Sequence, residues 1–436
     1  MNTPATFSPV RPGTLAVVAG AGRSGLAAAR LLARDGARVR LLEANPDRFD
    51  APLREELEGL GIEIVTGEHR PEQFAGARLV VISPGMPLAR LLDIMGDAAR
   101  GADAPEIVAE TELAWRHLDG EKIVAVTGTS GKTTTVSVAA AMLREAGKRV
   151  FLGGNIGTPL SEYVLKGERC DVLVLEVSSF QLQTCSTFRP DSAVILNITP
   201  NHLDYHKDMD EYVDAKFRLL ALQREEDLCV LDPSLREMAR GRGIRSRVVW
   251  FENAHRFPAM KLIGAHNEIN CEAAWQAVRE LGVDEAAAAR AVAAFNPLPH
   301  RLERVCEKGG VLYVNDSKCT TFSSMEIALR AMDRPVLLLC GGRYKGGDPD
   351  ELTPLIRERV RMVAGFGESR EIFEPAWKDV VPVRWHATLR PAMEWLRANA
   401  RPGDVMLLSP GTASFDLYKG MAFRGQDFKN IAGEIA

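Results

Sequence analysis

The sequence predicts an α/β protein of three domains with largely parallel sheets. Strand-length apolar runs alternate with helical segments along the whole chain, which is the order that parallel sheets require. Glycine-rich turns follow three of the predicted strands, at 20–25, 128–131 and 341–347. The 436 residues allow about three domains. Each would be large enough to bury its own core.

The composition is typical of a soluble globular protein. Apolar residues make up 46% and charged residues 26%, and the net charge of −4 gives no general attraction to nucleic acid or anionic membranes. Seven cysteines form no CxxC pair, as expected for reduced thiols. No long apolar window is present, and residues 1–12 lack the apolar core of a signal peptide. We expect a cytoplasmic protein.

The first glycine-rich turn lies in a βαβ pattern. A strand at 14–19 precedes Gly20-Ala21-Gly22-Arg23-Ser24-Gly25, a helix follows at 26–35, and a second strand at 38–42 ends at Glu43. This GxGxxG spacing, with an acidic residue about twenty positions on, predicts NAD or FAD binding. A helix N-terminus binds the negative charge of a pyrophosphate and does not distinguish the group attached to it. The pyrophosphate of a nucleotide sugar is therefore an alternative ligand.

The turn at 128–133 predicts a phosphate site. A strand at 123–126 runs into Gly128-x-x-Gly131-Lys132-Thr133, and an apolar helix follows at 136–143. Glycines let backbone N–H groups converge on phosphate oxygens, Lys132 can reach the terminal phosphates, and Thr133 can bind magnesium. The full P-loop pattern needs glycine where this chain has Val126. The strand and helix on either side still favour a nucleoside triphosphate as the ligand.

Three later features are candidates for metal or acid–base chemistry. Glu176 ends the buried strand at 172–177, where a magnesium-binding carboxylate is expected beside a P-loop. His202, Asp204 and His206 lie within five residues of one loop, a pattern that also occurs without function. Lys216 lies in a helix predicted at 209–220, where a lysine is usually on the surface.

The domain boundaries are predicted near residues 119 and 297. Residues 106–117 predict a helix and 118–121 its exit, so the first domain is 1–119. The proline-broken stretch 296–299 ends the central domain at 297 and starts the third domain, 298–436. We expect Rossmann-like first and third domains on either side of a P-loop ATPase-like central domain.

Eight short motifs, in register over nearly the whole chain, resemble the Mur ligase family. They are Thr127–Thr134, Gly154–Gly157, Glu176–Gln181, Asn197–His206, His266-Asn267, Pro299–Glu303, Asn315–Lys318 and Leu408–Pro410. The short first domain, the run 298–303 and the tail Ser414-Phe415-Asp416 are similar to the branch that joins D-glutamate to UDP-N-acetylmuramoyl-L-alanine. The resemblance implies ATP-dependent amide ligation through an acyl phosphate, as a step of peptidoglycan precursor synthesis.

The resemblance also implies roles for individual residues. Those matching the ATP site are Gly128, Thr129, Ser130, Gly131, Lys132, Thr133 and Thr134, with Asn267, Arg301 and Asp316 reaching from across a domain interface. Two Mg²⁺ sites are implied, one on Thr133 and Glu176 and one on His202 and a Lys216 carbamylated by CO₂. Lys132, His202 and Lys216 are the implied catalytic residues.

The two remaining substrates are assigned in the same way. Residues matching contacts to the UDP substrate are Arg23, Ser24, Gly85, Asn155, Ser178 and Gln181. Residues matching the glutamate pocket are His300, Lys318, Thr320, Lys345, Ser414 and Met421. The chain departs from the family pattern at Asn201, where an aspartate is common, and at Met421, where an aromatic residue is common.

Several alternatives stay open on the sequence. An L-glutamate-using variant of the reaction is one, because charge does not report the handedness of an amino acid. A non-catalytic nucleotide-binding module and an NAD-dependent oxidoreductase are others. The folylpolyglutamate synthetases lack a first domain of the kind predicted at 14–43. We expect a monomer. Because the implied site is divided between domains, we also expect it to close around its substrates.

Overall fold

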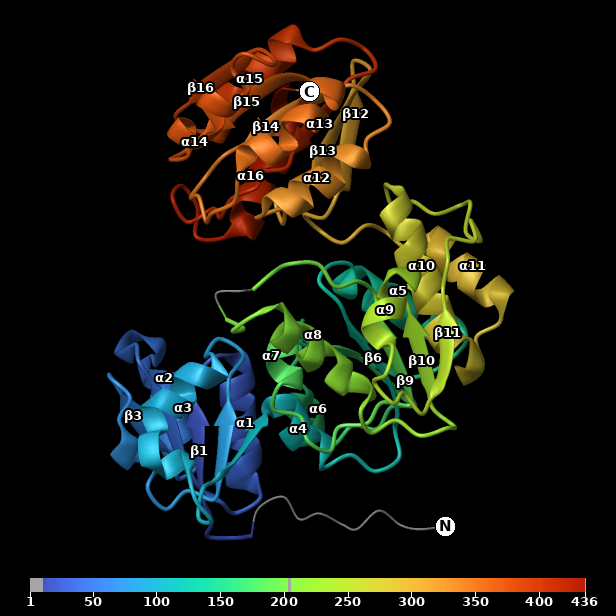
Figure 1. Cartoon of the computed structure of the whole chain (residues 1–436). Coiled ribbons are helices and arrows are strands. Elements are labelled where there is room, and N and C mark those ends of the chain that lie inside the picture. The colour runs from blue at the N-terminus through green and yellow to red at the C-terminus, as the bar shows by residue number, and fades with distance from the viewer. Residues whose placement is uncertain (1–10, 203–204, 436) are drawn as a thin grey trace. The chain divides into compact units, whose positions relative to one another are not determined.

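The computed structural model describes residues 11–202 and 205–435 and contains three separate sheets, one after another along the chain (Figure 1). The chain divides into two compact units. The first unit runs to Arg256 and includes Ile269–Val292, and the second consists of Phe257–Glu268 and the chain from Ala293 onward. The first unit therefore holds two sheets and the second unit holds one.

The first sheet has five parallel strands in the order β3-β2-β1-β4-β5. Its strands are β1 Leu15–Ala19, β2 Arg38–Glu43, β3 Glu63–Thr66, β4 Leu79–Ile82 and β5 Glu106–Ala109. Its helices are α1 Arg23–Arg34, α2 Ala51–Gly59, α3 Leu88–Met95 and α4 Glu110–Trp115. The order β3-β2-β1-β4-β5 reverses direction between β1 and β4, and in such sheets ligands bind at this switch point.

The helix predicted at 106–117 is wrong in its first four residues. Glu106–Ala109 forms β5 and pairs in parallel with β4, with Leu79 opposite Glu106 and Ile82 opposite Ala109. The helix begins only at Glu110. A four-residue stretch is too short to show a strand period, so the neighbouring strand rather than local preference decided its conformation.

The central sheet has six parallel strands in the order β11-β10-β9-β6-β8-β7. Its strands are β6 Lys122–Thr127, β7 Val150–Gly154, β8 Val172–Glu176, β9 Ser192–Ile195, β10 Leu228–Leu231 and β11 Arg247–Trp250. The following helices are α5 Lys132–Glu145, α6 Leu160–Lys166, α7 Ser179–Leu182, α8 Met209–Phe217, α9 Arg236–Ala239, α10 Ala265–Val278 and α11 Glu285–Ala294. The helix predicted at 209–220 ends as a 3₁₀ turn at Arg218–Leu220.

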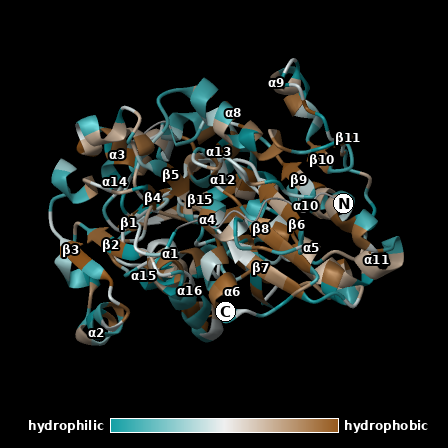
Figure 2. Cartoon of the chain, turned by 90° about the horizontal axis from the view of Figure 1, so that it is seen from below, coloured by the Kyte–Doolittle hydropathy of each residue, from teal (hydrophilic) through white to brown (hydrophobic). Residues whose placement is uncertain are grey.

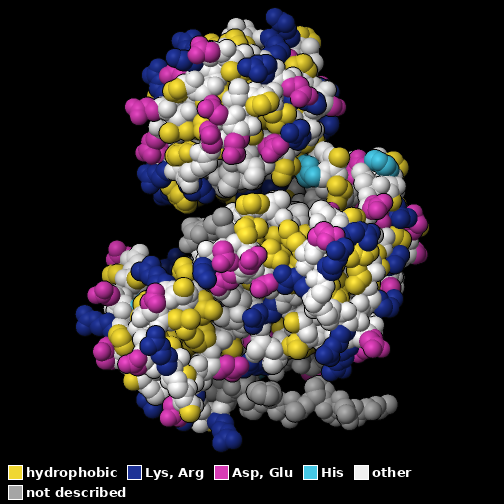
Figure 3. All heavy atoms as spheres, in the orientation of Figure 1, with side chains coloured by type: hydrophobic (Ala, Val, Ile, Leu, Met, Phe, Trp, Pro, Cys, Tyr) yellow, Lys and Arg dark blue, Asp and Glu magenta, His cyan; other side chains and the backbone are white. Residues whose placement is uncertain are grey.

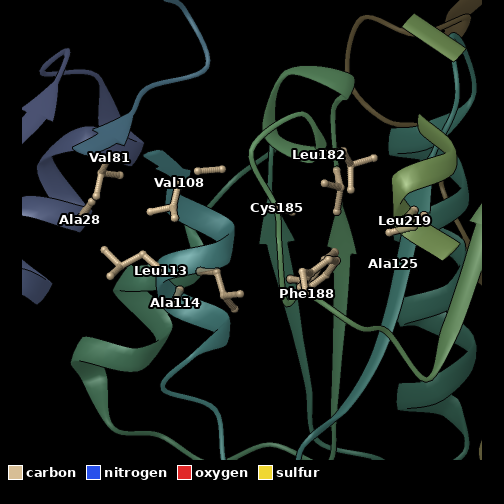
Figure 4. Packing of buried hydrophobic residues seen from close by; sticks show 14 of the residues in the cluster. Ala28, Val81, Val108, Leu113, Ala114, Ala125, Leu182, Cys185, Phe188 and Leu219 are labelled. Atoms are coloured by element: carbon tan, nitrogen blue, oxygen red, sulfur yellow. The ribbon is translucent and has the colours of Figure 1, made fainter. Parts of the chain in front are cut away.

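The first two sheets share one hydrophobic core. The cluster includes Ala28 and Val81 of the first sheet layer, Leu113 of α4, and Leu182 and Phe188 of the central part (Figure 4). Figure 2 shows the strands of the central sheet as mainly hydrophobic. Because α4 contributes apolar side chains to both sheets, the two pack as one body, which explains why they form a single unit.

The third sheet is mixed, in the order β12-β13-β17-β14-β15-β16, and only β12 is antiparallel to its neighbour. Its strands are β12 Glu303–Lys308, β13 Val311–Asn315, β14 Val336–Cys340, β15 Val360–Phe366, β16 Val383–His386 and β17 Val405–Leu408. Its helices are α12 Phe322–Arg330, α13 Thr353–Arg359, α14 Arg370–Trp377, α15 Leu389–Asn399 and α16 Met421–Ile435. The predicted α/β fold class is confirmed.

The surface agrees with the composition. Figure 3 shows basic and acidic side chains interspersed on the visible face, with no large area of a single sign. Within residues 11–202 and 205–435, no helix is both long enough and apolar enough to cross a membrane. All seven cysteines are free thiols, as the sequence predicted.

Candidate active site

The glycine-rich loop at 128–131 lies at the carboxyl end of β6, next to the middle of the central sheet. Gly128 and Gly131 have φ values of +152° and +85°, a range that favours glycine. A Cβ on Gly131 would collide with the side chain of Asn270. The loop therefore needs glycine at these two positions to bring backbone N–H groups to the start of α5.

Asn197, for which the sequence predicted no role, holds this loop in place. Its backbone carbonyl accepts a hydrogen bond from Thr129 N at 2.9 Å. Its side-chain oxygen accepts from Ser130 N at 2.8 Å, and its amide donates to Ser130 O at 3.2 Å. The available signal was an amide residue close after an apolar strand, which is a common place for a loop-fixing side chain.

Two lysine ammonium groups converge on the loop. Lys132 Nζ donates to the carbonyls of Gly128 and Thr129, both at 2.8 Å. Lys216 Nζ donates to the same Gly128 carbonyl at 2.9 Å and lies 4.5 Å from the centre of the Tyr212 ring. The Lys132 ammonium thus places positive charge on the loop, which suits a polyphosphate. Thr134 follows in the first turn of α5.

Lys216 is not a surface lysine, so that interpretation is wrong. Its exposed fraction is only 2%. Burial, with a smaller contribution from the nearby Lys132 charge, lowers its pKa well below the usual value for lysine. A larger fraction of the amine is therefore neutral at physiological pH, and a neutral amine can act as a nucleophile.

Glu176 joins the loop to the segment after β7. Its Oε2 atom accepts a hydrogen bond from Thr133 Oγ1 at 2.7 Å, and its Oε1 atom accepts from Asn155 Nδ2 at 2.8 Å. The structure thus brings together Thr133 and Glu176, the predicted first metal pair, and Asn155, a predicted substrate residue. Within 11–202 and 205–435, no three His, Cys, Asp or Glu side chains form a metal-binding group.

His202 packs against Phe180, which lies four residues after Glu176. His202 has a left-handed backbone with φ of +56°, and its ring meets the Phe180 ring edge-on at 4.9 Å between centroids. His206 is buried and shares a 2.9 Å hydrogen bond with Ser179 Oγ. Asp204, the third member of the predicted cluster, lies outside the described residues.

The GxGxxG turn has a different polar neighbour. Glu43 at the end of β2 accepts from Ala21 N at 2.9 Å and from Asn45 N at 3.0 Å. Its carboxylate therefore stabilises the turn itself. Arg23 is exposed and Ser24 half-buried at the start of α1, and the exposed Gly85 lies in the neighbouring turn after β4.

Ser178 and Gln181 form the N-terminal capping box of α7. Gln181 Oε1 accepts from the backbone and the hydroxyl of Ser178, both at 3.0 Å, and its amide donates to Thr111 Oγ1 of α4 at 2.9 Å. Gln181 is 1% exposed. Its polar atoms are therefore used to fix α7 against α4.

In the second unit, the predicted residues gather around Asp316, which follows β13. Asp316 accepts from Leu302 N at 3.2 Å and from Ser409 Oγ at 3.3 Å, and burial raises its pKa to about 7. Arg301 contributes a favourable charge nearby. His300 Nδ1 shares a 2.9 Å hydrogen bond with Asn315, and burial lowers the His300 pKa. Lys318 N donates to the His300 carbonyl at 3.0 Å.

The other predicted glutamate-pocket residues follow the carboxyl ends of strands in the same sheet. Lys345 is exposed after β14, Ser414 is buried after β17, and Thr320 and Met421 are half-buried. The Met421 carbonyl accepts from Ser317 Oγ at 2.8 Å, which brings the start of α16 beside the turn after β13.

Arg424 joins these segments, and the sequence analysis missed it. Its guanidinium is fully buried and donates to Ser317 Oγ and O at 3.0 Å and to Thr412 O at 3.1 Å, with longer bonds to Gly341 O and Ala413 O. Burial lowers its pKa to about 10. An arginine in a helix gives no sequence signal of burial, because arginine is usually exposed.

Two asparagines on α10 lie near the unit boundary. Asn267 belongs to the second unit, and its amide donates to Ile263 O at 2.7 Å. Asn270 belongs to the first unit and lies against Gly131, as the collision with a Cβ there indicates. Asn270 was not among the predicted site residues, although its spacing of three from Asn267 on a helix was a usable signal.

Solved structures define the class of fold. The crystal structure of MurF ligase from Thermotoga maritima in complex with ADP has a TM-score of 0.59 and 18% identity, covering 91% of this chain and 96% of that one. MurF from Acinetobacter baumannii has a TM-score of 0.58 and 16% identity, covering 98% and 92%. The three successive sheets are thus the fold of Mur ligases.

Sequence comparisons specify the family more closely. The Mur ligase middle domain matches residues 126–257, and the Mur ligase MurD-like N-terminal domain matches residues 14–102. A UDP-N-acetylmuramoylalanine--D-glutamate ligase of Desulfovibrio desulfuricans is 60% identical over 97% of both chains. The enzyme of the same name from Geobacter metallireducens is 39% identical over 95% of this chain and 96% of its own. The chain belongs to the Mur ligase family, in the group of these D-glutamate ligases.

Proposed function

We propose that the protein is an ATP-dependent ligase that adds D-glutamate to UDP-N-acetylmuramoyl-L-alanine during peptidoglycan precursor synthesis. The 60% identity over 97% of both chains to a relative of that name carries the proposal. The loop at 128–133, with its convergent lysines and the Thr133–Glu176 pair, supports the use of ATP.

The proposed reaction has two steps. The terminal carboxylate of the UDP substrate attacks the γ-phosphorus of ATP, forming an acyl phosphate as the bond to ADP breaks. The glutamate amine then attacks the acyl carbon, and phosphate leaves from the tetrahedral intermediate as the nitrogen loses a proton. Both steps depend on positioning and on neutralising charge. Hydride transfer plays no part, so the GxGxxG turn would hold the pyrophosphate of the UDP substrate instead of NAD.

Residue roles in ATP binding follow from the loop. We assign the phosphates to Gly128–Thr134, where Lys132 would move from its loop carbonyls to the terminal phosphate. Asn267, Arg301 and Asp316 are assigned to the rest of the nucleotide. Closure of the second unit on the first is part of this proposal, because these three residues belong to the second unit.

The oxygen donors present fit Mg²⁺. The Thr133 hydroxyl and the Glu176 carboxylate are 2.7 Å apart and are ligands that Mg²⁺ prefers. We assign one Mg²⁺ to this pair and a second to His202 and Lys216. When bound, Mg²⁺ supplies charge neutralisation for the transferred phosphoryl group. Lys216 would take part as a carbamate, because an ammonium group repels a cation.

The buried position of Lys216 favours that carbamate. Its lowered pKa leaves more neutral amine to attack CO₂, forming a C–N bond with loss of one proton. Activity should therefore fall in CO₂-free buffer and return on addition of bicarbonate. A Lys216→Ala variant should be inactive and regain activity with a small carboxylate such as acetate. Activity that is independent of bicarbonate would contradict the carbamate.

The two substrate pockets complete the proposal. The residues assigned to the UDP substrate are Arg23, Ser24, Gly85, Asn155, Ser178 and Gln181. Gln181 would act indirectly, by fixing α7 against α4. His300, Lys318, Thr320, Lys345, Ser414 and Met421 are assigned to glutamate, whose two carboxylates suit cationic residues. We also propose three functional domains, 1–119, 120–297 and 298–436. We further propose that the protein is a cytoplasmic monomer. Size-exclusion chromatography would test the oligomeric state.

Phosphate release tests the proposed function. ATP, Mg²⁺ and UDP-N-acetylmuramoyl-L-alanine are supplied with D-glutamate or L-glutamate in parallel. We expect release with the D-isomer only. Release with L-glutamate alone would move the protein to the L-glutamate-using variant of the reaction. Binding of ATP without release in either reaction would identify a nucleotide-binding module.

A further inference from the structure

We propose that Tyr205 is a positioning residue that couples the UDP-substrate site to the magnesium–ATP site. It would do so by holding the His202 turn of the central part against the turn at Ser83–Met86 of the first sheet. The inference rests on the proposed function, because that function assigns substrates to both turns. All of its contacts lie within the first unit.

The first observation is a hydrogen bond between the two parts of this unit. Tyr205 Oη donates to the Met86 carbonyl at 2.8 Å, across 119 positions of sequence. Met86 directly follows Gly85, and its N–H donates to Ser83 O at 3.0 Å. Ser83 Oγ in turn donates to Gly20 O at 2.9 Å. Tyr205 is thus linked to both turns that we assign to the UDP substrate.

The second observation is the position of the Tyr205 ring. It stacks on the Phe180 ring with centroids 3.8 Å apart and planes 30° apart. Phe180 lies four residues after Glu176 and also meets the His202 ring edge-on at 4.9 Å. Tyr205 therefore packs on Phe180, which belongs to the segment that follows Glu176, the predicted magnesium ligand. Phe180 in turn contacts His202, the predicted metal-binding histidine.

The third observation is the backbone of the His202 turn. His202 has a φ of +56°, in the left-handed region that residues with a side chain adopt uncommonly. Its carbonyl accepts hydrogen bonds from Tyr205 N at 3.0 Å and from His206 N at 2.9 Å. Tyr205 is therefore fixed at both ends. Its N–H stabilises the strained histidine and its hydroxyl reaches the other sheet.

These contacts give Tyr205 a specific consequence. A substrate that orders the Ser83–Met86 turn would also fix the Met86 carbonyl, and through Tyr205 the backbone of His202. Coupling between two sites is reciprocal, so magnesium–ATP and the UDP substrate should strengthen each other's binding. Burial raises the Tyr205 pKa to about 12, so the hydroxyl remains a neutral donor at physiological pH.

A Tyr205→Phe variant isolates the hydroxyl, because phenylalanine retains the ring that stacks on Phe180. Calorimetry would give the Kd of a non-hydrolysable ATP analogue with Mg²⁺, with and without saturating UDP-N-acetylmuramoyl-L-alanine. The ratio of the two Kd values measures the coupling. We expect the unmodified protein to bind the analogue several-fold tighter with the UDP substrate. We expect the ratio in Tyr205→Phe to approach one and kcat to fall about fivefold, the size expected for one hydrogen bond.

Tyr163→Phe is the matched control. The Tyr163 hydroxyl donates to Glu121 at 3.0 Å within the central part and contacts neither turn. The same chemical change there should leave the coupling ratio unaltered. Melting temperatures of all three proteins would show whether the two variants lose similar stability.

Three outcomes would overturn the role of Tyr205. They are an unchanged ratio in Tyr205→Phe, a ratio of one in the unmodified protein, and an equal loss of coupling in Tyr163→Phe. Turnover of the unmodified protein with D-glutamate separates the two proposals. Turnover combined with any of these outcomes overturns the role of Tyr205 alone, whereas no turnover overturns the proposed function.

Discussion

The two glycine-rich turns of the first unit have the same place in their sheets but different surroundings. Both follow a buried strand, β1 or β6, and both lead directly into a helix. In the turn at 20–25, the Glu43 carboxylate accepts from Ala21 N at 2.9 Å and the Arg48 guanidinium donates to Ala21 O at 3.1 Å. In the turn at 128–131, two ammonium groups donate to one carbonyl, that of Gly128.

This difference separates what glycines do from what side chains do. Glycines allow the backbone to turn and expose N–H groups, and they do so in both turns. Other elements add charged groups to each turn: Glu43 from β2 and Arg48 at the first, and Lys216 from α8 and Glu176 from β8 at the second. A glycine pattern therefore predicts an anion site, whereas the neighbouring strands and helices determine which anion and what chemistry.

Removing the charge of the second turn should have the largest effect. Lys132→Ala should lower kcat about a thousandfold, because preorganised charge at a developing phosphate is a large part of catalysis. The affinity for the UDP substrate should remain nearly unchanged, because Lys132 is not among the residues assigned to that substrate. Phosphate release and calorimetric titration with the UDP substrate would measure the two effects. Loss of UDP-substrate binding would show that the loop assignment is wrong.

The two turn carboxylates offer a matched pair of variants. Glu176→Gln should lower kcat about a hundredfold and raise the Mg²⁺ concentration needed for half-maximal rate, because the amide is a weaker metal ligand. Glu43→Gln should leave the Mg²⁺ requirement unchanged, because the Glu43 carboxylate accepts hydrogen bonds from backbone N–H groups of its own turn and of Asn45. Rate measurements over a Mg²⁺ series would compare them. Equal shifts in both variants would contradict the distinction.

The glycines themselves can be compared next. Gly131→Ala should weaken binding of an ATP analogue about tenfold, because its φ is +85° and the added Cβ collides with Asn270. Gly22 has a φ of −69°, and a Cβ there would meet nothing within 4 Å. Gly22→Ala should therefore leave both ATP-analogue binding and the melting temperature unaltered. A similar loss of ATP-analogue binding in both variants would contradict the assignment of ATP to the turn at 128–131.

The sequence was sufficient for features that depend on local pattern. Short apolar runs bounded by turn residues predicted the strands at 14–19, 38–42, 123–126 and 172–177 to within one residue at each end. The glycine spacing predicted both turns, because the backbone conformation there admits few other residues. The Mur ligase fold followed from several motifs in register, which no single motif would have supported.

The remaining features depend on contacts between distant segments. Asn197 meets Ser130 across 67 positions, and Arg424 meets Ser317 across 107. Lys216 has the sequence context of a surface lysine. It is buried because α8 places its ammonium end against the loop at Gly128. No period or propensity encodes such pairs, since each depends on how the sheets bring their carboxyl ends together. The Glu106–Ala109 strand was missed for the same reason.

The smallest expected effect concerns Glu110, in the helix that joins the two sheets carrying the turns. Its carboxylate is buried and accepts a hydrogen bond from Ser161 N of α6, and Oε2 has no partner among the described residues. Burial raises its pKa to about 7. Because folding raises this pKa, the folded state binds the proton more tightly than the unfolded state. The contribution to stability is therefore complete below about pH 4 and is lost as pH rises through 7.

Glu110→Gln removes this titration while keeping an oxygen for Ser161 N. At pH 8 the variant should be more stable than the unmodified protein by about 2 kcal/mol, since no buried charge forms. At pH 5 the two should differ little. Thermal unfolding at both pH values measures the difference, which should be a few degrees. Asp316 in the second unit also has a pKa raised to about 7. Its contribution to the pH dependence of stability should persist in Glu110→Gln. An Asp316→Asn variant would serve as the reference for that contribution. If the stability of Glu110→Gln depended on pH in the same way as that of the unmodified protein, Glu110 would not be a buried, protonated group between the two sheets.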